Sequence, residues 1–289
     1  MSNLTETIGA GDTVEGVLNY VAPDSRVNRR YVFPGDEVNT GRFVSHRVAI
    51  RDARCATPAP TLDTHGFELF RDKSAVTDFH DRAEIDRLYP QEVVAAVQRI
   101  TGADLVLPTG YLLRTAADNA AERMIQPPAA DVHVDMAWHS APRTARQVFD
   151  QQGPAGRTYR RFLCTSFWRT FSPPPQDWPL ALCDGTSISQ HNGEPNRLIF
   201  TEARPTDADI AAALAHEDEL PAATIFRYTP DQCWFYYPEM NRDEAIVIKF
   251  YDSDHGHAWF APHTAFHDET RPGARTRESI EFRTVAYWF

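Results

Sequence analysis

The chain has 289 residues, of which 42% are hydrophobic and 24% are charged, and it carries a formal net charge of −11 with a sequence pI of about 5.4. This composition is typical of a folded globular protein and excludes an intrinsically disordered chain. The acidic balance argues against nucleic acid or an anionic membrane as the main partner, because both favour a basic surface, but a local cluster of arginines could still bind an anionic small molecule.

The beginning of the chain lacks the signals of export. Residues 1–13 have no basic start followed by an apolar run, and no stretch approaches the roughly 20 apolar residues of a membrane span. The cysteines form no Cys-x-x-Cys pair, which argues against a Cys-rich zinc or iron–sulfur site and favours a reducing compartment. We therefore expect a cytoplasmic protein, with its oligomeric state left open. The cysteines are Cys55, Cys164, Cys183 and Cys233.

Strands and then helices are predicted before residue 104. Residues 16–21 and 43–50 alternate apolar and polar side chains, which is typical of strands. After a Pro-containing linker at 57–60 the pattern predicts a short helix and then a second one at 91–101. We expect residues 1–103 to form an extension packed on the core. The helix signals are Ser74 as N-cap, Pro90 before the second helix and Gly102 after it.

From residue 104 to the C-terminus the sequence predicts many strands and few helices. Helices are expected at 143–152 and, after the capping residue Thr206, at 207–220. The runs 224–237 and 244–251 flank a turn and predict a hairpin. This pattern indicates a sandwich, jelly roll or barrel, so we expect one domain, residues 1–289, whose core at 104–289 carries the site. The other predicted strands are 105–113, 132–137, 159–171, 180–188, 198–200, 257–266 and 278–289.

His133 and Asp135 lie two residues apart on the predicted strand 132–137. Side chains at positions i and i+2 of a strand point to the same face, so both can reach one metal ion without a turn. With His263, far downstream, they supply two imidazoles and one carboxylate, a set that holds one face of a ferrous ion. A His-x-Asp pair alone is more often a surface or hydrogen-bonded pair. Other histidines near these positions in sequence are His139, His255, His257 and His267.

Arg277 and Ser279 follow the distal histidine and share a face by the same two-residue period. A guanidinium beside a hydroxyl suits the distal carboxylate of 2-oxoglutarate. The arginine could instead pair with Glu278 or Glu281, and Arg283 could replace it as the carboxylate clamp. Only the ordered combination of His-x-Asp, a distal His and Arg-x-Ser indicates a non-haem iron oxygenase that uses 2-oxoglutarate.

Further side chains are candidates for contact with the cosubstrate or the substrate. Arg169 lies in an apolar strand candidate, where an unpaired charge is costly, so it either contacts the cosubstrate or pairs with an acid such as Asp184. Four more residues are candidates for the substrate pocket through their proximity in sequence. They are Tyr111, Arg114, Trp138 and His139.

Several segments of the chain match a known pattern. The C-terminal ones are 237–253, 262–266 and 277–283, and the upstream ones are 52–54, 62–67, 89–92, 101–103, 168–169 and 183–184. In these segments the chain resembles the gibberellin desaturase and cephamycin hydroxylase-like family. The resemblance implies an iron(II)- and 2-oxoglutarate-dependent oxygenase on a mainly β fold with flanking helices, the double-stranded β-helix (jelly roll, cupin-like).

The resemblance also implies a reaction. Iron(II), 2-oxoglutarate and O2 would together hydroxylate or desaturate a small-molecule intermediate of secondary metabolism, such as an amino acid, a β-lactam or a terpenoid. Succinate and carbon dioxide would be released by way of an iron(IV)-oxo species. The sequence leaves the substrate open, and it leaves hydroxylation, desaturation and ring closure undistinguished.

Two other classes of protein stay open at this point. A non-catalytic jelly-roll protein that binds a small molecule has no need of Arg277 and Ser279 after the distal histidine. A metal-dependent hydrolase requires a general base beside the metal and prefers zinc to iron.

Overall fold

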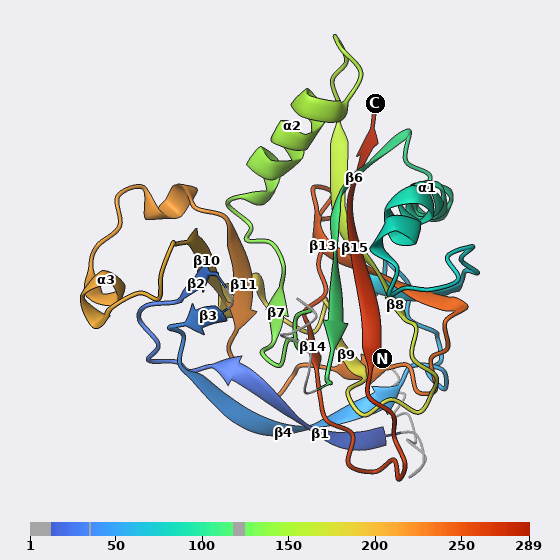
Figure 1. Ribbon diagram of the computed structural model, residues 1–289, viewed down its shortest axis with the longest axis horizontal. Coiled ribbons are helices and arrows are strands. Elements are labelled where there is room, and N and C mark those ends of the chain that lie inside the picture. The colour runs from blue at the N-terminus through green and yellow to red at the C-terminus, as the bar shows by residue number, and fades with distance from the viewer. Residues whose placement is uncertain (1–12, 35, 118–124) are drawn as a thin grey trace, which may run out of the picture.

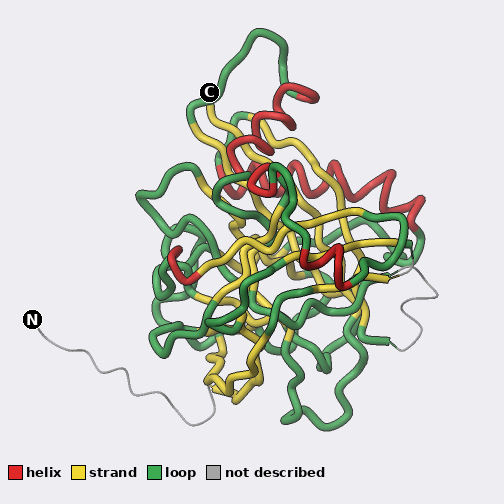
Figure 2. Tube along the Cα trace, turned by 90° about the vertical axis from the view of Figure 1, so that its left-hand side faces the viewer, coloured by secondary structure: helices red, strands yellow, loops and turns green. Residues whose placement is uncertain are grey.

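The computed structural model describes residues 13–34, 36–117 and 125–289, and the expectation that residues 1–13 lack a leader therefore lies, apart from Thr13, outside the described residues. Two packed β-sheets form the body of the described chain, and helices lie at its periphery (Figures 1 and 2). Within these ranges no helix is both long and apolar enough to cross a membrane.

The larger sheet has ten strands, and most neighbours in it are antiparallel. The exceptions are the pairs β4–β12 and β2–β10, which are parallel. In spatial order its strands are β1 (Thr13–Val21), β4 (Phe43–Asp52), β12 (Trp234–Tyr236), β9 (Leu180–Cys183), β14 (His263–Ala265), β7 (His133–Val134), β11 (Ala222–Phe226), β10 (Gly193–Phe200), β2 (Arg29–Phe33) and β3 (Asp36–Asn39).

The smaller sheet has five strands, all antiparallel to their neighbours. Its order is β5 (Phe67–Arg71), β13 (Glu244–Asp252), β8 (Arg161–Thr170), β15 (Glu278–Trp288) and β6 (Leu105–Thr115). One core cluster joins the two sheets, with Ala181 and Trp234 from the larger and Phe250 and Val285 from the smaller. The prediction of a mainly β jelly roll is confirmed.

The N-terminal part of the chain belongs to both sheets. It contributes β1, β2, β3 and β4 to the larger sheet and β5 to the smaller one. The segment that we expected as an extension on the core therefore supplies strands to the core itself.

Helix α1 (Arg82–Thr101) covers the outer face of the smaller sheet (Figure 1). Asp81 caps its first turn, and it ends at Gly102, whose φ of 67° is the left-handed conformation that glycine adopts readily. The prediction that Pro90 opens a helix is wrong, because Pro90 lies inside α1. The apolar stripe on both sides of Pro90 is buried against the sheet, which offsets the backbone bond that proline removes. The stripe consists of Ile85, Tyr89, Val93, Ala96 and Val97.

Of the remaining helix predictions, one is wrong, one is confirmed and one is confirmed only at its start. Ser74 caps no helix, and its hydroxyl donates to Glu92 at 2.5 Å. Helix α2 (Ala141–Gln152) confirms the helix expected at 143–152. Helix α3 (Asp207–Ala211) begins at Thr206 as predicted but ends early, because none of its residues is buried and no apolar face stabilises a longer helix. Two short 3-10 helices lie at Gln190–Asn192 and Glu217–Glu219.

The expected hairpin of residues 224–237 and 244–251 is absent from the structure. Strand β12 pairs with β4 and β9 in the larger sheet, whereas β13 pairs with β5 and β8 in the smaller one. Both strands are almost completely buried, and their sequences are therefore continuously apolar. Such a sequence does not indicate which neighbouring strand each one pairs with. The turn between them crosses from one sheet to the other.

Candidate metal centre and cosubstrate cavity

His133, Asp135 and His263 come together between the two sheets. Strands β7 and β14 are neighbours, and His133 pairs with His263 in their register. The three side chains offer ligand atoms that all lie within 4.8 Å of one another, and they are the one such group among the described residues. Asp135 lies in a bend just after β7, so the strand expected at 132–137 is shorter than predicted, yet its carboxylate still faces both imidazoles.

The outer nitrogen of each imidazole is held by a backbone carbonyl. His133 Nδ1 donates to the carbonyl of Asp131 at 2.7 Å, and His263 Nδ1 donates to that of Ala261 at 3.2 Å. A ring that donates through Nδ1 keeps the lone pair of Nε2 for a metal ion. Burial and the neighbouring His263 lower the pKa of His133, which favours the neutral ring that a metal ligand requires.

Asp135 has one carboxylate oxygen engaged and one unpaired. Its Oδ1 accepts from Arg283 Nη2 at 2.9 Å, while its buried Oδ2 has no hydrogen-bond partner in the described chain and lies 3.5 Å from His263 Nε2. Burial raises the pKa of Asp135, but the charge of Arg283 and the two neighbouring imidazoles together outweigh burial and hold that pKa well below its ordinary value. His133 Nε2 lies 3.9 Å from Oδ1, so the carboxylate has an imidazole nitrogen near each oxygen, and with its Oδ2 unpaired it fits a ferrous ion.

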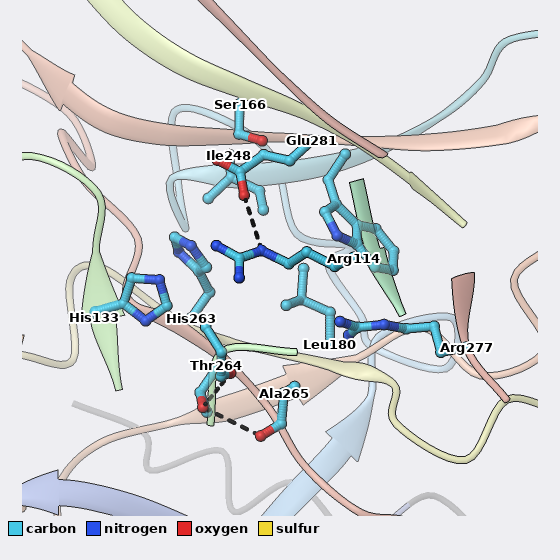
Figure 3. Close-up of a pocket in the computed structure, with 12 residues that line it drawn as sticks. Arg114, His133, Ser166, Leu180, Ile248, His263, Thr264, Ala265, Arg277 and Glu281 are labelled. Carbon is cyan, nitrogen blue, oxygen red and sulfur yellow. Dashed lines mark hydrogen bonds and ion pairs between the residues drawn. The ribbon is translucent and has the colours of Figure 1, made fainter. Parts of the chain in front are cut away.

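A cavity extends from the two histidines toward Arg277 (Figure 3). Side chains of both sheets line it, with Leu180 from the larger sheet and Ser166, Trp168 and Ile248 from the smaller one. The hydroxyl of Ser166 is buried and has no hydrogen-bond partner among the described residues. Polar atoms without hydrogen-bond partners therefore lie along the cavity as well as beside the two histidines.

Arg277 and Ser279 form the far end of this region, and both are 1% exposed. Arg277 Nη1 donates to the carbonyl of Trp178 at 2.8 Å, but Arg277 Nε and Ser279 Oγ have no partner in the described part of the chain. Burial, and next the positive charge of Arg114, lower the pKa of Arg277 to about 9. A buried guanidinium with an unpaired Nε is stabilised by an anion. The distal carboxylate of 2-oxoglutarate is an anion of this kind.

Arg114 and Glu281 complete the cavity wall. Figure 3 shows the Arg114 guanidinium between His263 and Arg277. Its Nε lies 3.7 Å from Glu281 Oε2, and its Nη1 donates to the carbonyl of Pro127 at 3.0 Å. Arg114, a candidate for substrate contact in the sequence, therefore borders the path between the metal ligands and Arg277.

Two functional candidates on β15 were missed as part of the site. Glu281 and Arg283 were considered only as an ion pair or as an alternative clamp, whereas the structure places Arg283 on Asp135 and Glu281 beside Arg114. The signal that could have found them is the strand period, because positions 277, 279, 281 and 283 share one face.

Arg169 is not brought to the cavity. It lies on the face of β8 that packs toward α1, where Nη2 bonds Asp72 at 2.6 Å and Nε donates to the hydroxyl of Tyr89 at 3.2 Å. Its Nη1 donates to the backbone carbonyls of Asp72 and Arg242. The acid that pairs with Arg169 is therefore Asp72, and the expected alternative Asp184 was the wrong partner.

The three remaining substrate candidates lie in different surroundings. Tyr111 donates to Asp86 of α1 at 2.9 Å, on the outer face of β6, and His139 is exposed. Trp138 packs its ring against several aromatic side chains, and its Nε1 is buried without a partner among the described residues. The rings around it are Phe226, Tyr251, Trp259 and Phe260.

The other histidines near the ligands in sequence lie outside the metal group. His255 and His257 are exposed, and the ring of His255 stacks on Trp259. His267 is exposed and packs against Trp178.

Comparison with known proteins gives three kinds of match. Residues 18–287 match the family described as "Oxidoreductase/YMDC permease-like domain". The chain is 27% identical over 291 residues to the "Fe(II)/2-oxoglutarate-dependent dioxygenase nvfI" of Aspergillus novofumigatus, which covers 97% of this chain and 99% of that protein. It is 27% identical over 326 residues to the "Hydroxylase/desaturase CTB9" of Cercospora beticola, with 99% and 98% covered. The solved structure of the "iron and alpha-ketoglutarate-dependent endoperoxidase NvfI" superposes with a TM-score of 0.78 at 25% identity, and covers 96% of this chain and 99% of that one.

Proposed function

The chain belongs to the oxidoreductase/YMDC permease-like domain family, and we propose that His133, Asp135 and His263 are its iron(II) ligands. It is an iron(II)- and 2-oxoglutarate-dependent oxygenase, a class that uses O2 as its oxidant. The observation that carries the ligand assignment is the buried carboxylate of Asp135, whose Oδ2 is unpaired and which lies beside two imidazoles with their outer nitrogens already held.

Each side chain of the site has a separate task in this proposal. The three ligands would hold iron(II) and would leave it able to bind 2-oxoglutarate and O2. Bound in this way, the iron supplies the oxidising chemistry that attacks a substrate carbon, with release of succinate and carbon dioxide. The buried walls of the cavity keep water from the reacting atoms, and the backbone carbonyls of Asp131 and Ala261 fix the orientation of the imidazoles.

The far end of the cavity suits the distal carboxylate of 2-oxoglutarate. Arg277 and Ser279 present an unpaired Nε and an unpaired hydroxyl, both buried. Arg114 adds a second positive charge beside the cavity. The single negative charge of Glu281 balances only part of the positive charge of Arg114 and Arg277. A dicarboxylate supplies the missing negative charge, so we propose Arg277 and Ser279 as its clamp and Arg114 as a neighbouring contact.

The substrate is proposed to be a small-molecule intermediate of secondary metabolism that is hydroxylated or desaturated. The support is the activity named for relatives such as the hydroxylase/desaturase of Cercospora beticola. Of the substrate candidates, Trp138 is the one we retain as a contact, because its buried Nε1 lacks a partner in the described chain and it lies three residues after Asp135. We also propose a reducing, cytoplasmic location, since the four cysteines form no disulfide with one another.

The test is oxygen-dependent formation of succinate from 2-oxoglutarate by protein reconstituted with iron(II). A panel of amino acids, β-lactams and terpenoid acids is added one at a time, and a true substrate should raise the rate and yield an oxidised product. D135A should abolish succinate formation, whereas D150A, which removes an exposed acid on α2, should leave it unchanged. Succinate formation that survives in D135A would contradict the ligand assignment.

A further inference from the structure

One carboxylate oxygen of Asp135, Oδ1, is held by a hydrogen bond from Arg283. Arg283 Nη2 donates to Oδ1 at 2.9 Å, so one oxygen of the carboxylate is committed to a guanidinium. The other oxygen, Oδ2, is the unpaired atom and lies 3.5 Å from His263 Nε2, whereas Oδ1 lies 3.9 Å from His133 Nε2 in addition to its hydrogen bond from Arg283. The two oxygens of Asp135 therefore have different surroundings.

Arg283 is itself held in place from two sides. Its Nε donates to Glu281 Oε1 at 2.5 Å, and its guanidinium carbon lies 5.8 Å from the centre of the Phe250 ring. The pairing of β15 with β6 shifts register between Arg283 and Thr284, a β-bulge opposite 108–110. Bulges often redirect a side chain at a functional site, and this one lies next to the residue that reaches Asp135.

Glu281 joins this contact to the rest of the cavity. One of its oxygens accepts from Arg283, and the other lies 3.7 Å from Arg114 Nε. Glu281 is 5% exposed and Arg114 is 7% exposed, so little water competes for these contacts. A continuous chain of charged groups thus runs from Asp135 through Arg283 and Glu281 to Arg114.

We propose that Arg283 is a positioning residue that restricts Asp135 to a single metal-binding oxygen. The inference rests on the proposed function of the site. A carboxylate can bind a metal through one oxygen or through both. If both oxygens of Asp135 bound the iron, they would take a position that 2-oxoglutarate or O2 needs. Because Arg283 holds Oδ1 by a hydrogen bond, that coordination position stays open. The contact with Glu281 holds the guanidinium of Arg283 in the orientation that reaches Asp135.

The first test is a structure of the wild-type protein loaded with a divalent metal in the absence of O2. We expect Asp135 to bind through Oδ2 alone, with Arg283 still on Oδ1. Both oxygens on the metal, or Arg283 displaced from Asp135, would overturn the proposal. This test involves no variant and so does not depend on how a substitution affects folding.

The second test compares R283M with R161M. Arg161 forms an equally close pair with Asp252, at 2.7 Å, so R161M controls for the loss of a buried arginine–aspartate pair at a place remote from the metal. The affinity for cobalt(II) should fall by about 10- to 100-fold in R283M, as for other residues that orient a metal ligand, and should not change in R161M. At saturating metal, R283M should also bind 2-oxoglutarate more weakly than wild type, and R283K, which keeps the charge, should recover part of both losses.

The outcomes separate the two proposals. If wild-type protein binds neither metal nor 2-oxoglutarate, the proposed function fails. If wild type binds both, and folded R283M binds both with the same affinities and the same visible spectrum, then the positioning role of Arg283 is contradicted while the proposed function stands.

Discussion

Two buried arginines of this chain have the same burial and opposite surroundings. Arg169, 0% exposed, lies between β8 and α1, and each of its three guanidinium nitrogens has a partner, including Asp72 at 2.6 Å. Arg277, 1% exposed, lies between the sheets; its guanidinium donates to the carbonyl of Trp178, and its Nε has no partner in the described chain. A buried charge with a full set of partners is explained by the fold, whereas an incomplete set leaves donors that a ligand can use.

The same contrast applies to the acids. Asp252, fully buried, accepts from both Arg161 and Lys249, at 2.7 and 2.9 Å. Asp135 accepts from Arg283 through Oδ1 only, and its Oδ2 lies beside His263 without a hydrogen-bond partner in the described chain. The site thus differs from the Asp252 ion pairs of the smaller sheet in having polar atoms without partners.

The largest expected effect that tests this contrast is on the free energy of unfolding. R169M should destabilise the protein by about 3 to 5 kcal/mol, because it leaves Asp72 Oδ1 and the backbone carbonyls of Asp72 and Arg242 without their donor. R277M should cause little destabilisation of the metal-free protein, because it removes a buried charge that lacks an acidic partner. Urea denaturation of the two variants measures the difference, and equal destabilisation would break the comparison.

The next effect concerns the cosubstrate. R277M should weaken 2-oxoglutarate binding by about 2 to 5 kcal/mol, the usual cost of truncating one partner of a buried charged contact, while metal affinity stays unchanged. The control ligand is 2-oxobutyrate, a keto acid without the distal carboxylate, whose affinity should be the same in wild type and R277M. Calorimetric titration under anaerobic conditions gives both values. A loss of equal size for the two ligands would show that Arg277 does not bind the distal carboxylate.

A smaller effect is expected from the hydroxyl. S279A should weaken 2-oxoglutarate binding by about 0.5 to 1.5 kcal/mol, the net contribution of one hydrogen bond. The exposed β4 variant S45A is the control and should bind the cosubstrate as wild type does. If S279A matches S45A, the hydroxyl takes no part in the clamp.

The sequence alone predicted more of the site than of its surroundings. The alternation of Arg277 and Ser279 follows from the strand period, which is a local property, whereas Asp135 meets His133 from a bend just after β7. The jelly-roll architecture followed from the family resemblance together with the abundance of strands. The partners of Arg169 could not be predicted, because Asp72 and Tyr89 come from distant elements that only the fold brings together.

Where the local predictions were wrong, tertiary packing outweighed a local signal. Pro90 predicts a helix start, but the buried stripe of α1 continues across it. The runs that form β12 and β13 flank a turn, yet each strand completes its hydrogen bonds in a different sheet. Arg283, an alternative carboxylate clamp by sequence, instead contacts Asp135, which lies in the bend after β7 that no local pattern predicts.

The most direct test of the central claim is the visible spectrum of the protein under anaerobic conditions, with iron(II) and then 2-oxoglutarate added. The account predicts a charge-transfer band that appears in wild type only when both are present, and that is absent in D135A. A folded, iron-saturated wild type that shows no band with 2-oxoglutarate, or a D135A variant that shows the same band, would contradict it.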